Sequence, residues 1–332
     1  MHSAPALPPE LERPIFELCA LSKPNFIPTL MLVAYRVKDW VEPLLYRIFT
    51  MNAHRSNFIA RHLPEFTPDS LSVSLQRKPH TWFRTTVRHF AYIEDNFFRD
   101  PIEQTLIAIC LDVEDLFLSS GTFGNRRFGR EWVRHVEALP HLRRVTLHLL
   151  QEDQLHPFLA SFASSSGHYY SSLTHLTLSL NFGSSSDHYY EFPDDLTPDP
   201  DSITALTARA LSVLPHLTHL SLNGYFITRE VNEILQISTL LVIIFNFAYT
   251  YYPAWDRSLL TDAVLSDDRV VVISPVEGDY FDLRRWGLGA LSGLNGRDYW
   301  RDAEEFIEKR RTGEIEAGKH VCPTASDSMN GY

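Results

Sequence analysis

Apolar residues alternate with polar ones in several short segments through the middle of the chain. Five segments share one spacing, with apolar residues at the first, fourth and sixth positions: 113–118, 142–147, 173–178, 217–222 and 240–245. Alternate residues of a β-strand point to the same face of a sheet, so positions four and six share a face. The pattern predicts a series of similar short strands, each with one buried face.

The spacing of these segments indicates a repeat. Weaker members lie at 87–90 and 270–273, and the centres of successive segments are 23 to 44 residues apart. The stretches 130–138 and 202–213 have the pattern of helices that return the chain to the next parallel strand. Stacked units bury apolar edges that no single unit can bury. We expect an α/β fold over residues 51–296, an irregular leucine-rich-repeat-like solenoid, with a mixed α/β sheet of another topology as the alternative.

Polar residues between the buried ones would form ladders on the open, concave face of such a solenoid, with neighbours about 4.8 Å apart. The expected ladders are His89, Asp115, Arg144, His175 and His219; then Thr146, Thr177 and Ser221; then His148, Ser179 and Asn223. From them we select as candidate target-binding residues Arg144, His148, His175, His219 and Asn223. The alternative is a solvated sheet face without a ligand.

The first 50 residues have a helical pattern instead. Leu11, Ile15 and Leu18 recur at i, i+4 and i+7 after a proline pair that favours a helix start. A second stripe follows, and then a third segment over residues 44–49; the stripe consists of Leu30, Val33, Val37 and Trp40. Three short helices bury little surface alone, so they must pack on the rest of the chain or on another protein.

The sequence Leu-Pro-Pro-Glu-Leu at residues 7–11, followed by Ile15 and Phe16, resembles an F-box. The family's later Val-Cys-x-x-Trp is represented here by Val33, Ala34 and Val37. With the Leu-Pro-His-Leu segments and residues 300–315, most of the chain resembles the F-box and leucine-rich-repeat-like proteins of mushroom-forming fungi.

This resemblance implies a function in protein docking. It assigns binding of a Skp-type adaptor of cullin ubiquitin ligases to Leu7, Pro8, Leu11, Ile15 and Phe16. The chain would then be a non-catalytic substrate receptor for an unknown protein target. The alternative is a stand-alone leucine-rich-repeat interaction scaffold without a ubiquitin-ligase role, whose N-terminal helices cap the solenoid.

The C-terminal region has its own pattern. Its helical stripe consists of Tyr299, Trp300, Ala303, Phe306 and Ile307. Acidic residues precede basic ones, as the helix dipole favours, so residues 297–317 are predicted to form a helix that caps the solenoid. We expect residues 318–332 to be disordered. Residues 183–201, with six carboxylates and no Lys or Arg, are predicted to form an extended loop.

Composition narrows the possible partners and compartments. The chain of 332 residues is 44% hydrophobic, enough for a sizeable core, and its net charge of -11 argues against nucleic acid and anionic membranes. The apolar stretch 239–248 is too short to cross a bilayer and is predicted to be a buried strand. Three distant cysteines and an N-terminus without a basic start and apolar run indicate a cytoplasmic or nuclear protein.

Motifs for catalysis are weak. Glycines at 287 and 289 do not directly follow a predicted strand, and those at 121, 124 and 129 lack the Lys-Ser/Thr of a P-loop. His216 and His219 bracket a strand start without further ligands at fixed spacing. We therefore expect no enzymatic activity, no catalytic residue, no cofactor and no metal site.

Overall fold

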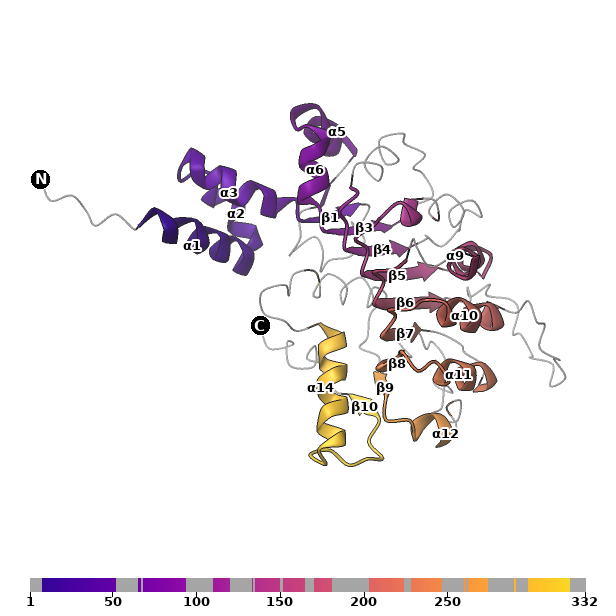
Figure 1. Ribbon diagram of the computed structural model, residues 1–332. Helices are drawn as coiled ribbons and strands as arrows, with labels where there is room; N and C mark the ends of the chain where they lie inside the picture. Colours follow the sequence, from indigo (N-terminus) through magenta and orange to yellow (C-terminus); the bar gives the residue numbers. More distant parts are fainter. Residues whose placement is uncertain are drawn as a thin grey trace, which may run out of the picture.

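The computed structural model describes residues 8–51, 65–66, 68–93, 110–119, 133, 135–149, 152–164, 170–180, 203–223, 228–246, 260, 262–273, 290 and 298–322. These residues form a group of short N-terminal helices beside one long β-sheet, with helices on both faces of the sheet (Figure 1). The predicted acidic loop, 183–201, lies outside the described residues.

The described residues form a ten-stranded sheet in which every neighbouring pair of strands is parallel. The strands are β1 (Ile48–Met51), β2 (Glu65–Phe66), β3 (His89–Ile93), β4 (Asp115–Ser119), β5 (Arg144–Leu149), β6 (His175–Leu180), β7 (His219–Asn223), β8 (Val242–Asn246), β9 (Val270–Ile273) and β10 (Val321–Cys322). Their order is β10-β9-β8-β7-β6-β5-β4-β3-β1-β2. From β3 to β9 the order in space is therefore the order in sequence.

The strands stack in one register, so equivalent residues of the repeated pattern lie side by side. Val145 of β5 pairs with Leu176 of β6, which pairs with Leu220 of β7. The three predicted polar ladders are confirmed by the pairing of β3 to β7. We call the sheet face that carries them the ladder face, and the opposite one the leucine face.

Helices cover the leucine face (Figure 1). They are α5 (Pro68–Arg77), α6 (His80–Thr86), α9 (Glu152–Ser164), α10 (Ile203–Ser212), α11 (Thr228–Leu235) and α12 (Asp262–Leu265). Their apolar side chains, among them Phe158, Phe162 and Leu211, form one core with the leucines of the strands. Helix α10 confirms the helix predicted over 202–213. Sequential parallel strands with helices on this face give an α/β fold that is compatible with a solenoid-like arrangement.

Arg269 joins α11 to the strands that follow it. Its guanidinium donates to the carbonyl oxygens of Leu235, Ile237 and Leu240, and pairs with Asp267 at 2.6 Å. The carbonyls near a helix C-terminus lack partners within the helix, and a cation there satisfies them. The same guanidinium holds the pKa of Asp267 below its ordinary value.

We expect Arg269→Met to lower the free energy of unfolding by about 2 kcal/mol, because three carbonyls lose a charged donor. Chemical denaturation followed by circular dichroism measures this change. Arg311→Met is the matched control, since Arg311 and Asp268 pair at the surface, where an ion pair contributes less than about 1 kcal/mol. Equal effects of the two substitutions would mean that the hydrogen bonds of Arg269 to the three carbonyls do not stabilise the fold.

A helix also lies on the ladder face. Helix α14 (Tyr299–Arg311) begins at the N-cap Asp298, whose carboxylate accepts from the backbone N–H of Arg301. Its apolar stripe packs against the ladder-face side chains of β8 and β9: Trp300, Ala303, Phe306 and Ile307 against Val242, Ile244, Val271 and Ile273. The sheet is therefore covered on both faces here, as parallel sheets usually are.

The C-terminal segment differs from its prediction in two respects. Helix α14 is present as expected, but it lies across the ladder face instead of closing the end of the array. The edge of the sheet is extended by β10, which pairs with β9 through Val321 and Cys322. The expectation of disorder from residue 318 is therefore wrong up to residue 322, while 323–332 lie outside the described residues.

The N-terminal helices are α1 (Pro9–Ser22), the 3-10 turn η1 (Pro24–Phe26), α2 (Ile27–Leu30) and α3 (Tyr35–Leu45). They share a small core of Ala20, Ile27, Val37 and Val41. The third helix predicted over 44–49 is wrong, because residues 48–51 form β1 and pair with both β3 and β2. Among the described residues, no helix is long and apolar enough to cross a membrane.

Candidate functional site

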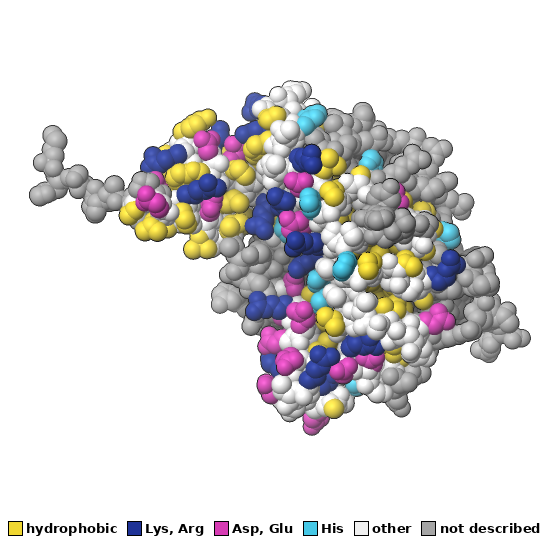
Figure 2. Space-filling view, in the orientation of Figure 1, with side chains coloured by type: hydrophobic (Ala, Val, Ile, Leu, Met, Phe, Trp, Pro, Cys, Tyr) yellow, Lys and Arg dark blue, Asp and Glu magenta, His cyan; other side chains and the backbone are white. Residues whose placement is uncertain are grey.

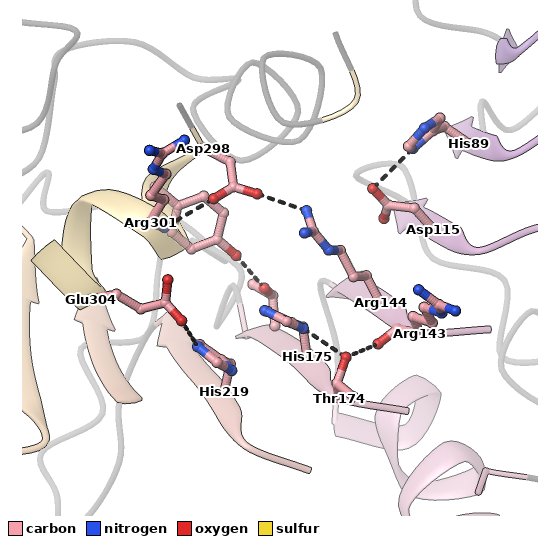
Figure 3. Close-up of polar contacts among 12 residues, drawn as sticks. His89, Asp115, Arg143, Arg144, Thr174, His175, His219, Asp298, Arg301 and Glu304 are labelled. Atoms are coloured by element: carbon pink, nitrogen blue, oxygen red, sulfur yellow. Dashed lines mark hydrogen bonds and ion pairs between the residues drawn. The ribbon is translucent and has the colours of Figure 1, made fainter. Parts of the chain in front are cut away.

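The candidate site on the ladder face lies where β5, β6 and β7 begin. Arg144, His175 and His219 are the first residues of these strands and are neighbours in register. Figure 3 shows their side chains directed toward the first turns of α14. The predicted neighbours therefore do lie together, but they face another part of the same chain.

Polar contacts tie α14 to this row of side chains. Arg144 Nη1 donates to Asp298 Oδ2 at 2.7 Å (Figure 3). The hydroxyls of Tyr299 and Thr177 are hydrogen-bonded at 2.6 Å. His219 Nε2 lies 3.0 Å from Glu304 Oε1. Since a carboxylate only accepts, Nε2 of neutral His219 carries the proton and donates it.

Trp300 adds an aromatic contact to the same row. The His175 and His219 rings are stacked, with centroids 4.1 Å apart and planes 13° from parallel. Trp300 meets both rings edge-on, at 5.2 Å and 5.6 Å between centroids, and is only 5% exposed. Burying an indole of this size contributes about 4 to 6 kcal/mol, more than the polar contacts around it. Helix α14 is thus an integral part of the fold.

Burial keeps both histidines neutral near pH 7. It lowers the pKa of His175 to about 2, with smaller contributions from His219 and the Arg144 cation. The pKa of His219 is also lowered by burial, although the Glu304 carboxylate acts in the opposite direction. Each Nδ1 lies 2.8 Å from the hydroxyl of the preceding threonine. The pair is therefore a set of neutral, hydrogen-bonded rings.

The rest of the ladder face is not an open surface either. Thr146, Thr177, Ser179 and Ser221 of the second and third ladders are buried, and His148 of the third ladder is half-buried. The expectation of an open, concave recognition face is therefore wrong for these residues. We considered a binding face and a solvated face. Both alternatives required these side chains to be exposed to solvent, and the buried ones are not.

The five predicted target-binding residues have different positions. Arg144, His175 and His219 contact α14. His148 is half-buried, and its Nδ1 lies 3.0 Å from the hydroxyl of Ser119. Asn223 pairs in register with Ser179, but its side chain lies outside what the structure describes. Of the first three, His219 is buried, so a target could reach it only if part of α14 moved away, whereas Arg144 and His175 keep part of their surface exposed.

A second candidate site is the surface of the N-terminal helices. Leu11, Ile15 and Leu18 of α1 are 52%, 47% and 58% exposed. We call these three residues the docking surface. Figure 2 shows hydrophobic side chains gathered on this part of the molecule. Helix α1 packs on α3 through a neighbouring stripe, which leaves the docking surface facing outward.

That packing stripe fixes the orientation of α1. Arg36 Nη2 pairs with Glu12 at 2.6 Å, and the rings of Phe16 and Trp40 are 6.5 Å apart. Ala20 continues the stripe into the small core. Of the predicted adaptor-binding residues, Pro8, Leu11 and Ile15 are therefore exposed, Phe16 is half-buried, and Leu7 lies outside the described residues.

Further exposed apolar residues, which we did not predict from the sequence, lie near the α2–α3 turn. They are Phe26, Leu32, Val33 and Tyr35, with Leu32 86% exposed. We assigned Val33 to one helical stripe with Leu30, Val37 and Trp40, which is wrong because residues 31–34 form a turn between two separate helices. The adjacent pair Leu32 and Val33, which one helix face cannot bury together, was the available signal.

In the described part of the chain, no group of three or more His, Cys, Asp or Glu side chains is placed to hold a metal ion. His89 Nδ1 and Asp115 Oδ2 lie 3.3 Å apart at the other end of the first ladder. Asp115 is buried, so this pair is a structural contact of β3 with β4.

Comparisons with known proteins add no assignment: no protein-family model, no curated protein and no solved structure matches the chain.

Proposed function

We propose that the chain is a non-catalytic protein-binding adaptor that attaches to its partner through the N-terminal helices. The observation that carries this proposal is the outward position of Leu11, Ile15 and Leu18 on one stripe of α1. Exposed apolar groups clustered on one element mark interaction sites more often than chance placement. An apolar helix stripe of this kind is suited to a groove on another protein.

The exposure of this stripe bears on the two functions considered from sequence. If the N-terminal helices only capped the array, Leu11, Ile15 and Phe16 would have to be buried within the chain. Phe16 is half-buried beside Trp40, but Leu11 and Ile15 are about half exposed, which counts against the cap interpretation. The small core of the helices is formed without them.

The partner we propose is a Skp-type adaptor of a cullin ubiquitin ligase, as the F-box resemblance implies. In this proposal the parallel array is leucine-rich-repeat-like and presents a protein target to the ligase. The sequential parallel strands with helices on the leucine face support that part. Arg144 and His175 could contribute their exposed parts to target binding, and the buried His219 only after movement of α14.

We expect the full chain to co-purify with a Skp-type adaptor, and Leu11→Asp with Ile15→Asp to weaken binding at least about 100-fold, because two central apolar contacts are replaced by charges. Isothermal titration calorimetry with the purified adaptor measures this. The matched control is Val73→Asp with Leu241→Asp, two exposed apolar residues elsewhere in the chain. We leave Phe16 unchanged because it packs on Trp40.

Two outcomes would count against the proposal. If the unmodified chain does not bind the adaptor, the partner is wrong and a stand-alone interaction scaffold is the better description. If both double variants bind as the unmodified chain does, the docking surface is wrongly placed, even though the partner is right.

A further inference from the structure

The contact between α14 and the stacked histidines has no role in the proposed docking. Its two imidazole rings can take up protons. His175 and His219 are stacked at 4.1 Å between centroids, and Trp300 covers both. Two imidazolium rings at that distance would repel each other. The closed contact therefore requires that at least one of the rings stays neutral.

The charged groups around the pair determine the response to acid. Among the described residues, the Arg144 cation approaches from β5, and the carboxylates of Asp298 and Glu304 approach from α14. Arg144 opposes protonation of both rings. Glu304 favours a proton on His219, but it is half exposed and binds only that ring. Asp298 is already paired with Arg144 at 2.7 Å.

We propose that residues 298–304, the beginning of α14, form an acid-operated latch that packs on Arg144, His175 and His219 at neutral pH and opens more often as the pH falls. The latch is a local device. The second half of α14 stays in place through Phe306 and Ile307 on β8 and β9, and through Arg310, which donates to the carbonyl oxygens of Val270 and Asp268.

The sign of the pH effect follows from the direction of both pKa shifts. In the closed state, burial keeps the pKa of each histidine below its ordinary value of 6.5. In the open state the rings return to water and to that value. The open state thus binds more protons than the closed state. Acid therefore increases the population of the open state below about pH 6.5, and a change of pH above that value does not alter it.

The same linkage gives the size of the effect. Each histidine that is neutral when closed and protonated when open increases the open population about tenfold per pH unit. Two such groups give at most about 100-fold per unit. Because Glu304 stabilises a proton on His219 in the closed state, we expect a slope between about 10-fold and 100-fold.

Hydrogen exchange measured by mass spectrometry on the full chain, between pH 7.5 and 5.0, tests the latch. After correction for intrinsic exchange rates, we expect protection of amides 300–304 to fall between about 10-fold and 100-fold per pH unit below 6.5. Protection of amides in β5 to β7 should stay constant. A fall of equal size in α14 and in these strands, or no fall after correction, would overturn the proposal.

Variants separate the latch from general acid sensitivity. His175→Phe with His219→Phe keeps two stacked rings but removes both protons, so the pH dependence of amides 300–304 should disappear. The single variant His175→Phe provides the test if the double variant does not fold, and its slope should not exceed about tenfold per unit. His141→Phe, at an exposed position, should behave as the unmodified chain does. An unchanged slope in the variants at 175 and 219 would overturn the assignment.

Discussion

Ile244→Asp is expected to prevent stable folding, with a loss of more than about 4 kcal/mol in the free energy of unfolding. Ile244 is fully buried on the ladder face, where it packs with Val271 and the apolar stripe of α14. A carboxylate there would have no cation or water to stabilise it, or would have to take up a proton at a cost. Thermal unfolding measures the effect, and the melting temperature should fall by more than about 8 °C.

Leu241→Asp is the control for this prediction. Leu241 lies three residues earlier and is 57% exposed, so the same substitution there should change stability by less than about 0.5 kcal/mol. In an open solenoid, both positions would tolerate aspartate because the concave face would be in water. Similar melting temperatures for the two variants would mean that α14 does not cover this face in solution.

The stacking of the strands could be predicted from the sequence because it depends on a local pattern. Val145, Leu176 and Leu220 recur at the same position of each segment, and one register satisfies all of them. A slip by one residue would turn every leucine toward the opposite face. The polar ladders follow from the same register, which is why His175 and His219 were correctly placed side by side.

The position of α14 could not be predicted in the same way. The apolar stripe of 299–307 indicates a helix with one buried face, but it does not identify the surface that buries it. Arg144 and Asp298 are separated by 154 residues in the sequence, and no local periodicity links them. A signal was nevertheless present in β8 and β9, where Val242 to Phe245 and Val270 to Ile273 are apolar on both faces. Strands of that kind are buried on both sides.

In the N-terminal region the first helix could be predicted from the sequence, but its exposed surface and the following strand could not. Leu11, Ile15 and Leu18 were correctly assigned to one stripe of a helix, but the pattern did not determine whether the rest of the chain would cover it. Residues 48 and 49, which begin β1, were assigned to a helix over 44–49 because short apolar runs do not distinguish helix from strand. Pairing with β3 determines the outcome, and that partner lies some 40 residues further along the chain.

Trp300→Ala should lower the free energy of unfolding by about 3 to 5 kcal/mol. The indole is 5% exposed and joins two sets of contacts, the stacked histidines on β6 and β7 and the apolar stripe of α14 on β8 and β9. Its removal leaves a cavity that neither set can fill, since the strands are held by their ladders. Urea denaturation at pH 7.5, where both histidines are neutral, measures the loss without a contribution from the latch.

Tyr299→Phe separates the packing of this turn from its hydrogen bonding. The substitution keeps the ring beside Trp300, with centroids 4.5 Å apart, but removes the hydroxyl that bonds Thr177. We expect a loss of about 1 kcal/mol, a fraction of the loss at position 300. If both variants lost about 1 kcal/mol, α14 would be held mainly by polar contacts, and the ladder face would then be accessible to a target at neutral pH. A larger loss at Trp300 means that packing holds the helix, as the proposed latch requires of its closed state.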